Sequence, residues 1–478
     1  MINPTSKDMK NLKYIWLAGL ALLSVAFTSC NEDDEYFDKK YQSTPIKVTQ
    51  IYLEDNESSV PDRPVEYARL GQLIRIEGSG LFGMKAVYIN GYDTYFNRTY
   101  VTDNSMLITI NTKTPVSDAE PEDRDIIRFV KDGAELAYNF TIRAASPTVK
   151  SVSNTLPQPG ETVTVYGTGL EETSKVTLPG GTEVTDGIQS DEDGEWYSFT
   201  MPSGITASGS IYSEGANGQA ATPAYFNDAN CIILDFDGKG TQGFWSWTET
   251  GSMINDEDLV NDPSTGSNRG KCLQIVPERL IAAGGASSGK PRVSECWTAG
   301  NDDAADDWSR MYPHIPATTP LTEVALQFDI YVPADAPWTN CGQIQISLFN
   351  NFNFGGIGSD DDGSSNQVAF YVPYIQDGAI VPFSTKGGWQ TVTIPFSEFN
   401  KYATLIADKQ VPTFQNVVDD RNAGTYRNFG MGFVNTDFSY RDVAVTSSTF
   451  TTRIYLDNWR VVPCKGVTIS DYPEDEEE

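Results

Sequence analysis

The chain has 478 residues, of which 39% are hydrophobic and 12% aromatic, and its formal net charge is −31. This length and apolar content exclude a disordered chain and provide for about three domains with buried cores. The charge excludes nucleic acid as a partner, because no basic stripe could displace phosphate counterions, and it disfavours acidic polysaccharides. It favours a neutral ligand, although acidity can also serve only to keep a secreted protein soluble.

The N-terminus carries the signals of an exported lipoprotein. Two lysines precede the apolar run 15–27, which is too short for a confident transmembrane helix but fits the core of a signal peptide. The run ends in Phe27-Thr28-Ser29-Cys30, which resembles a lipobox, so residues 1–30 are predicted to be a signal peptide with lipid on Cys30. The acidic run 31–35 resembles the surface-export signal of Bacteroidetes-type lipoproteins. These resemblances imply an outer-membrane anchor and exposure to the cell exterior, with periplasmic retention as the alternative.

A polar segment, 31–44, is expected to be a tether, and an internal repeat follows it. The run 74–81 (IRIEGSGL) corresponds to 163–170 (VTVYGTGL), and the offset between the copies stays constant. In each copy an alternating strand enters a G-x-G-L turn, where glycine permits a positive φ and leucine closes the core. Both copies resemble the immunoglobulin-like IPT/TIG domain. This implies two tandem β-sandwiches, 45–143 and 144–228, which we expect to act as spacers.

The third segment, 229–467, is predicted to be a larger all-β sandwich of jelly-roll type, followed by an acidic tail, 468–478. It contains many alternating strands and no clear helix, which favours two packed sheets. The predicted strands are 232–236, 271–276, 324–332, 343–349, 368–374, 390–396, 428–434 and 453–462.

Two of these strands, 324–332 and 343–349, each have one apolar and one polar face. The polar faces carry Gln327, Asp329, Gln343 and Gln345. Planar amides suit paired hydrogen bonds with neighbouring sugar hydroxyls, so these faces are expected to form a polar floor. Gly430 and Gly432 leave one side of their strand bare, which fits a groove for a bulky chain or close backbone packing.

Aromatic residues gather between Cys296 and Phe354, in a stretch with polar loops. An indole in a segment this polar is predicted to be exposed, and exposure of an indole to water is unfavourable unless it binds a ligand. Sugar rings are suitable ligands, because they stack on the faces of indole rings. For each tryptophan alone, packing as a loop anchor remains an equal alternative. Trp389 and Trp459 are expected in the core, and Trp245 and Trp247 are undecided. The candidate glycan-binding residues are Trp297, Trp308, Arg310, Tyr312, Trp338, Gln343, Gln345 and Phe354.

Taken together, the mature chain resembles the surface glycan-binding lipoproteins of TonB-dependent polysaccharide utilisation systems, of the B type with a xyloglucan-binding C-terminal domain. The resemblance rests on the lipobox, the repeats, and a last domain that opens with 231–238 (CIILDFDG) and closes with 454–462 (IYLDNWRVV). It implies a non-catalytic protein that captures a neutral plant-type β-glucan, xyloglucan or mixed-linkage glucan. The implied partners are a TonB-dependent transporter and a companion glycan-binding lipoprotein.

Two other function classes stay open. A glycoside hydrolase needs two carboxylates about 5–10 Å apart, but glutamates are few in the last domain and none forms an E-x-D-x-x-E strand. The only histidine, His314, lies between prolines and is not expected to form a catalytic triad or dyad. No catalytic residue is therefore predicted. An adhesin that binds proteins through the repeats is the third class.

No cofactor is expected, although a structural Ca²⁺ could use Asp235, Asp237 and Asp457 near the first and last strands of the sandwich. The cysteines after Cys30 are odd in number, so they cannot all pair within the chain. Cys231 and Cys464 bracket the last domain and are one candidate pair.

Overall fold

The computed structural model describes residues 36–54, 62–243, 259–266, 268–277, 292–298, 306–348, 357, 367–424 and 427–471. Within these ranges no helix is both long and apolar enough to cross a membrane. The signal peptide, Cys30, the Trp245/Trp247 pair and Phe354 lie outside the described residues. The chain divides into two compact units, with the boundary between Ala145 and Ser146.

The first unit is an immunoglobulin-like sandwich. One sheet has the order β2-β1-β4-β7, with bounds Arg63–Pro64, Lys47–Leu53, Leu73–Ser79 and Ser105–Thr109. The other has the order β6-β5-β8-β9, with bounds Tyr92–Asp93, Ala86–Ile89, Ile126–Val130 and Glu135–Asn139. A short parallel pair joins β3 (Tyr67–Arg69) to β10 (Thr141–Arg143). The inward residues of the two sheets form one hydrophobic core, in which Ile74, Val87 and Phe129 are fully buried.

The predicted tether 31–44 is wrong from residue 36 onward. Tyr36 is buried, and so is Gln42, the last residue of a short helix, α3 (Lys39–Gln42). The buried ammonium of Lys131 donates to the carbonyl of Tyr41 at 2.7 Å and also to that of Gly80, and burial lowers the pKa of Lys131. Because this segment is mostly polar, its composition did not reveal the few side chains that pack it against the hydrophobic core of the first unit.

The second unit begins with the second immunoglobulin-like copy. Its sheets have the orders β11-β12-β16-β15 and β14-β13-β17-β18. The bounds are Thr148–Val152, Thr162–Thr168, Trp196–Thr200 and Gln189–Ser190 for the first sheet, and Glu183–Val184, Lys175–Thr177, Tyr212–Gly215 and Gly218–Ala221 for the second.

The structure confirms the repeat at its turns. The first glycine of each G-x-G-L lies so close to the neighbouring strand that an added Cβ would be 1.9 Å from a carbonyl oxygen; these are Gly78 and Gly167. The second glycine has a φ of +70° in both copies, at Gly80 and Gly169. Only glycine adopts that conformation without strain beside another backbone. The leucine that follows is buried in each copy.

The rest of the second unit is a two-sheet, jelly-roll-type sandwich, as predicted. A six-stranded sheet has the order β21-β22-β33-β24-β29 with β19 also on β33, and its bounds are Leu259–Asn261, Lys271–Ile275, Ile454–Pro463, Val324–Tyr331, Gln390–Pro395 and Ile232–Leu234. A five-stranded sheet has the order β20-β23-β30-β25-β26, with bounds Gln242–Gly243, Arg292–Thr298, Gly430–Val434, Gln343–Ser347 and Val368–Tyr371. All eight predicted strands are present within a few residues.

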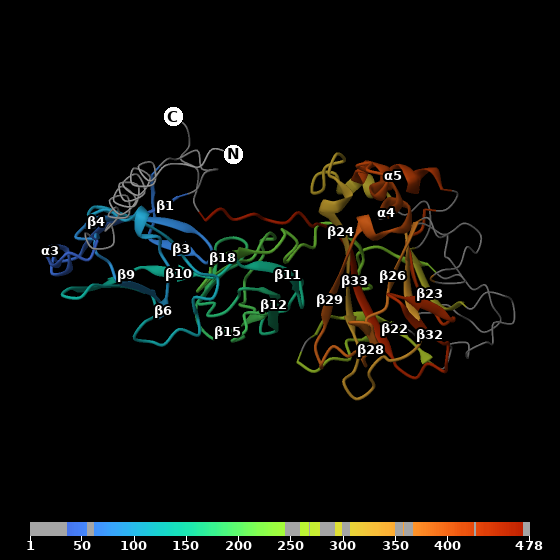
Figure 1. The fold of residues 1–478 in the computed structure, drawn as a ribbon. Coiled ribbons are helices and arrows are strands. Elements are labelled where there is room, and N and C mark those ends of the chain that lie inside the picture. The colour runs from blue at the N-terminus through green and yellow to red at the C-terminus, as the bar shows by residue number, and fades with distance from the viewer. Residues whose placement is uncertain are drawn as a thin grey trace, which may run out of the picture. The chain divides into compact units, whose positions relative to one another are not determined.

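The expectation that this domain lacks helices is wrong. Helices α4 (Asn400–Ala407) and α5 (Phe414–Ala423) lie together at one end of the sandwich (Figure 1). α5 begins with a capping box between Thr413 and Asn416, and it buries Phe414 and Arg421. The domain also has two hairpins, β27-β28 (Ile375–Gln376, Ala379–Ile380) and β31-β32 (Phe438–Tyr440, Val443–Val445).

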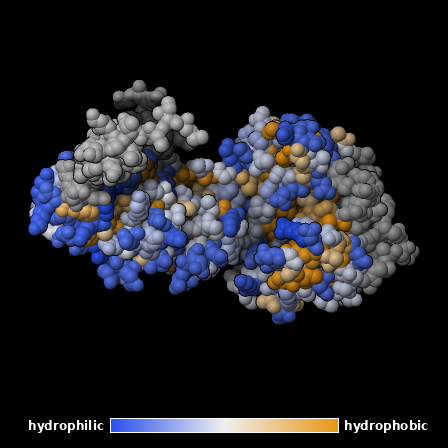
Figure 2. All heavy atoms as spheres, in the orientation of Figure 1, coloured by the Kyte–Doolittle hydropathy of each residue, from blue (hydrophilic) through white to orange (hydrophobic). Residues whose placement is uncertain are grey.

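The outer face of the six-stranded sheet packs against the second immunoglobulin-like copy. Ala325 and Val462 from this sheet belong to the hydrophobic core of that copy, and the hydroxyl of Thr155 donates to Gln327 Oε1 at 2.9 Å. Elsewhere on the sandwich, Figure 2 shows apolar residues gathered on the face turned to the viewer, whereas the visible face of the first unit is mostly hydrophilic.

Candidate functional site

The two polar strand faces predicted to form one floor lie in different sheets. Gln327 and Asp329 are on β24 and face the second immunoglobulin-like copy, whereas Gln343 and Gln345 are on β25 in the other sheet. The sequence predicted each alternation correctly, but neighbouring strands in the sequence need not be neighbours in a sandwich. The candidate floor is therefore limited to the five-stranded sheet.

The outer side of this sheet, away from the core, carries a compact polar set. In one row across the strands, Trp297 lies opposite Gly430, and Gly430 lies opposite Ser347. In the next row, Glu295, Gly432 and Gln345 are paired in the same way. We call this surface the amide face: Glu295, Trp297, Gln343, Gln345, Ser347, Gly430 and Gly432.

The Trp297 indole lies directly over the backbone of Gly430. A Cβ added at Gly430 would be 2.2 Å from Cε3 of that indole, so any larger residue would displace the ring. From the sequence, Gly430 was expected to leave room for a groove or to allow close packing. The structure shows close packing, because the Trp297 ring lies against this glycine. The indole is thereby held flat across the strand.

The amide face is buried in this structure, although it is polar. Gln343, Gln345 and Glu295 have no exposed surface, and Trp297 is 5% exposed. Gln343 Oε1 accepts the backbone N–H of Ile357 at 3.2 Å, while its Nε2 donates to no atom of the described chain. A buried amide hydrogen without an acceptor costs about 1–3 kcal/mol, and such groups often mark functional positions. This face could therefore give hydrogen bonds to a ligand's hydroxyls.

The predicted exposure of Trp308 and Trp338 is wrong, because both belong to the core. Trp338 is fully buried, its Nε1 donates to the carbonyl of Cys341 at 2.8 Å, and its ring contacts Phe433. Trp308 is 1% exposed and stands 3.9 Å from the guanidinium of Arg421. Their apolar partners come from distant parts of the chain, which the polarity of the local segment could not reveal. Both rings belong to the hydrophobic core of the sandwich, so neither can stack on a sugar.

The predicted exposure of Trp297 is wrong too, but this residue lies on the amide face with Gln343 and Gln345. Arg310 and Tyr312 lie elsewhere: Arg310 donates to the carbonyl of Ile232, and the Tyr312 hydroxyl donates to Gln415 on α5 at 2.9 Å. The predicted core positions are confirmed, since Trp389 is 5% exposed and Trp459 is fully buried.

The suggested calcium ligands are used in other ways. One oxygen of Asp235 accepts the N–H groups of Asp237 and Lys239, and both oxygens of Asp237 accept the N–H of Lys271. No group of three metal-ligating side chains occurs among the residues the structure describes. These aspartates do not fit a calcium site. Asp235 and Asp237 instead accept backbone N–H groups, and Asp457 is buried on strand β33.

Asp329 on β24 and its cross-strand partner Asp457 on β33 form a close carboxylate pair. This pair was not predicted from the sequence. Burial, and then the charge of Asp329, raise the pKa of Asp457 well above its usual value, which is a common sign of catalytic acids. Both side chains are fully buried, and Asp329 is engaged by Arg269 and Arg460. This pair is closed to a substrate and has a structural role.

The five described cysteines are free thiols, so Cys231 and Cys464 do not form a disulfide. Burial raises the pKa of the Cys231 thiol to about 12 and that of Cys464 to about 11. Thiols with raised pKa values carry little thiolate and react slowly.

Comparison with known proteins gives the following matches. Residues 226–463 match the model of a family described as the surface glycan-binding protein B xyloglucan binding domain. An IPT/TIG domain-containing protein of Bacteroides ovatus is 28% identical over 177 residues, which cover 37% of this chain and 34% of that relative. The chain thus spans about a third of the length of the curated relative it matches.

Two solved structures are similar to this chain. The surface glycan-binding protein B of Prevotella bryantii is 22% identical with a TM-score of 0.60, over 89% of this chain and all of that chain. A surface glycan-binding protein B from a complex xyloglucan utilization locus in Bacteroides uniformis is 16% identical with a TM-score of 0.44, over 87% of this chain and 99% of that chain. The Prevotella structure shows that a chain of sandwiches like those described above is a known fold.

Proposed function

Because residues 226–463 of this chain belong to the surface glycan-binding protein B xyloglucan-binding domain family, we propose that the chain is a non-catalytic protein that binds a neutral β-glucan. The candidate ligands are xyloglucan and mixed-linkage glucan, and the C-terminal sandwich binds them. The observation that carries this proposal is the family match, which spans the sandwich from its first strand to its last.

We propose the amide face as the glucan site because of its ring and polar groups, although its side chains are buried in this structure. Trp297 on β23 offers a flat ring, and the amides of Gln343 and Gln345 lie on β25, on the other side of β30. Gln343 Oε1 already accepts a backbone N–H from Ile357, and a sugar hydroxyl is a donor of the same kind. Its Nε2 provides a donor that no described residue uses.

The charge of the amide face favours an uncharged chain. Glu295 is fully buried beside Gly432 and Gln345, so a uronic acid placed there would meet a carboxylate in a low-dielectric environment. A neutral hexose can instead donate a hydroxyl hydrogen to that carboxylate, which forms a strong hydrogen bond.

We place this binding protein on the cell surface. The lipobox ending at Cys30 and the acidic run after it support a lipid anchor in the outer membrane. From there the protein would pass its glucan to a TonB-dependent transporter, together with a companion glycan-binding lipoprotein. Protease shaving of intact cells tests the location, because a protein that resists the protease would not be on the outer surface.

Affinity gel electrophoresis tests the function and separates the three classes. Purified protein is run in gels containing xyloglucan or mixed-linkage β-glucan, and the same polysaccharides are assayed for reducing ends after incubation. Retardation without new reducing ends is the expected result. New reducing ends would show a hydrolase, and unchanged mobility in both gels would overturn the proposal and favour an adhesin.

A further inference from the structure

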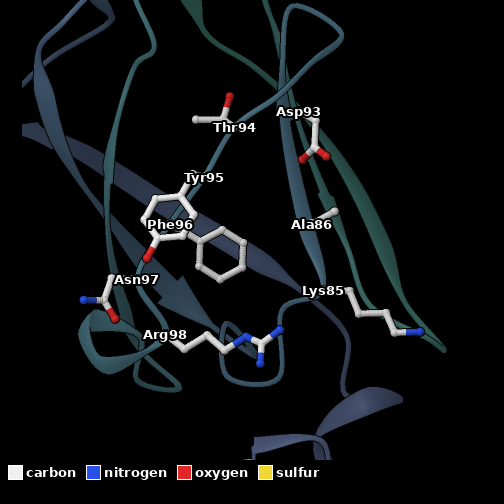
Figure 3. Close-up of a pocket in the computed structure, with 8 residues that line it drawn as sticks. All are labelled: Lys85, Ala86, Asp93, Thr94, Tyr95, Phe96, Asn97 and Arg98. Carbon is white, nitrogen blue, oxygen red and sulfur yellow. The ribbon is translucent and has the colours of Figure 1, made fainter.

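The first immunoglobulin-like sandwich, which was expected to be only a spacer, has a pocket of about 380 Å³ on its surface (Figure 3). The pocket lies beside the loop that leads from β6 to the short helix η1 (Arg98–Tyr100), and the start of β5 closes it. Ligand pockets in proteins are roughly 300–1,000 Å³, so this one is large enough for a small ring system. Its main lining residues are Lys85, Asp93, Tyr95, Phe96, Asn97 and Arg98.

Tyr95 is the unusual residue of this pocket. Its side chain is 82% exposed, and its hydroxyl has no hydrogen-bond partner in the described part of the chain. The neighbouring Phe96 packs against the core and holds the loop in place, so Tyr95 is not needed as an anchor. A tyrosine ring left open to water offers apolar area and a polar end to a ligand.

Two other polar groups that line the pocket are also unused. The Asp93 carboxylate accepts no hydrogen bond from any described residue, and the Asn97 amide uses only its oxygen, which accepts the N–H of Thr99 at 3.0 Å. The pocket therefore presents a flat ring, a free acceptor and a free amide donor. This combination matches a sugar, whose C–H face stacks on aromatic rings and whose hydroxyls donate and accept.

The charges around the pocket balance, although the whole chain is strongly acidic. Lys85 forms an ion pair with Asp132, and the guanidinium of Arg98 stands 4.6 Å from the Phe37 ring. The charged lining residues are therefore Lys85, Arg98 and Asp93, and Lys85 is paired with Asp132 outside the pocket. A neutral ligand is favoured over an anionic or cationic one.

We propose that this pocket is a second saccharide contact, at which one ring of a neutral glycan stacks on Tyr95 and bonds to Asp93 and Asn97. The proposal rests on the proposed function, because the glycan is the one that the C-terminal sandwich captures. A chain long enough to reach both sites binds more tightly through effective concentration. A short oligosaccharide held at the sandwich does not gain in this way.

The test uses the full chain as wild type, Tyr95→Ala and Tyr100→Ala. Tyr100 is a matched control, because it is 59% exposed and does not line the pocket. Affinity gels with xyloglucan polysaccharide measure retention, and calorimetry measures binding of a xyloglucan oligosaccharide. We expect Tyr95→Ala to weaken retention of the polysaccharide by about five- to tenfold, as for loss of one stacked ring. Oligosaccharide affinity, melting temperature and the Tyr100→Ala variant should match wild type.

Three results would overturn the second contact. Equal retention of Tyr95→Ala and wild type would show that the pocket does not bind the glycan, and it would leave the proposed function intact. The pocket would then be a candidate contact for a protein partner. Equal weakening by Tyr95→Ala and Tyr100→Ala would show a general surface effect. If wild type itself is not retarded, the proposed function fails first, and the second contact fails with it.

Discussion

Arg460 on β33 donates from Nη2 to Asp329 Oδ1 on β24 at 3.1 Å, and neither side chain has any exposed surface. Arg269 bonds to the other oxygen of Asp329 and reaches Glu161 in the second immunoglobulin-like copy, both at 3.0 Å. Arg460 also donates to the Thr155 hydroxyl of that copy. This buried ion network joins the second copy to the sandwich and fixes the orientation of one on the other.

Asp329→Ala should destabilise the second unit strongly. Removal of one partner of a buried ion pair leaves charges without compensation, which costs about 3–5 kcal/mol. The free energy of unfolding from urea titration measures the loss. Asp132→Ala is the control. Asp132 pairs with Lys85, and at least half of each side chain is exposed. Such a surface ion pair contributes about 0–1 kcal/mol. Similar losses for the two variants would refute a special role for the buried network.

Asp457→Asn should change how stability depends on pH. Burial raises the pKa of Asp457 above its unfolded value, so between the two pKa values the folded state binds more protons. Stability from this group is therefore highest below the unfolded pKa, about 3.9, and falls as pH rises through the folded pKa. Asparagine cannot ionise, so the melting temperature of the variant relative to wild type should rise from acidic to neutral pH. The opposite trend in thermal melts would show that Asp457 is stabilised as the carboxylate.

Trp338→Ala and Trp308→Ala should act on stability. Deletion of a buried tryptophan side chain costs about 3–5 kcal/mol, and both rings are fully packed in the core. Differential scanning calorimetry should show a large drop in melting temperature, with glycan affinity retained by any protein that stays folded. Unchanged melting with lost glycan retention would instead restore these rings to the binding surface.

Gly430→Ala tests whether the position of the Trp297 ring matters. The added methyl group would meet the indole at 2.2 Å, so the ring must move. Glycan affinity should fall several-fold and the tryptophan emission spectrum should shift. Gly388→Ala is the control, because an added Cβ there has no atom within 4 Å and its φ is ordinary. If both variants bind glycan like wild type, the flat indole is not part of the site.

The sequence predicted those features that depend on local pattern. Alternation located the eight strands, and the G-x-G-L turns predicted the positive φ at Gly80 but not the close backbone approach at Gly78. Alternation also showed correctly which side of β25 is polar. It could not show that β24 and β25 lie in opposite sheets, because strand order is set by packing between distant segments.

The tryptophans show the same limit of prediction from local sequence. Trp297 was expected to be exposed beside a polar loop, but it lies within strand β23, Arg292–Thr298. Trp338 follows a proline in a polar segment, yet its partners Tyr374 and Phe433 come from elsewhere in the sandwich. Local polarity predicts exposure only where the tertiary fold brings no apolar partner to the ring.

The most direct test of the account is calorimetric titration of the full chain with a xyloglucan oligosaccharide, comparing Gln345→Ala with Gln327→Ala. Both glutamines are fully buried on the outer face of a sheet, but Gln345 is on the amide face and Gln327 lies under the second immunoglobulin-like copy. We predict a Kd about tenfold higher for Gln345→Ala, as for loss of hydrogen bonds worth about 1.4 kcal/mol, and an unchanged Kd for Gln327→Ala. A wild-type Kd for Gln345→Ala would contradict glycan binding at the amide face.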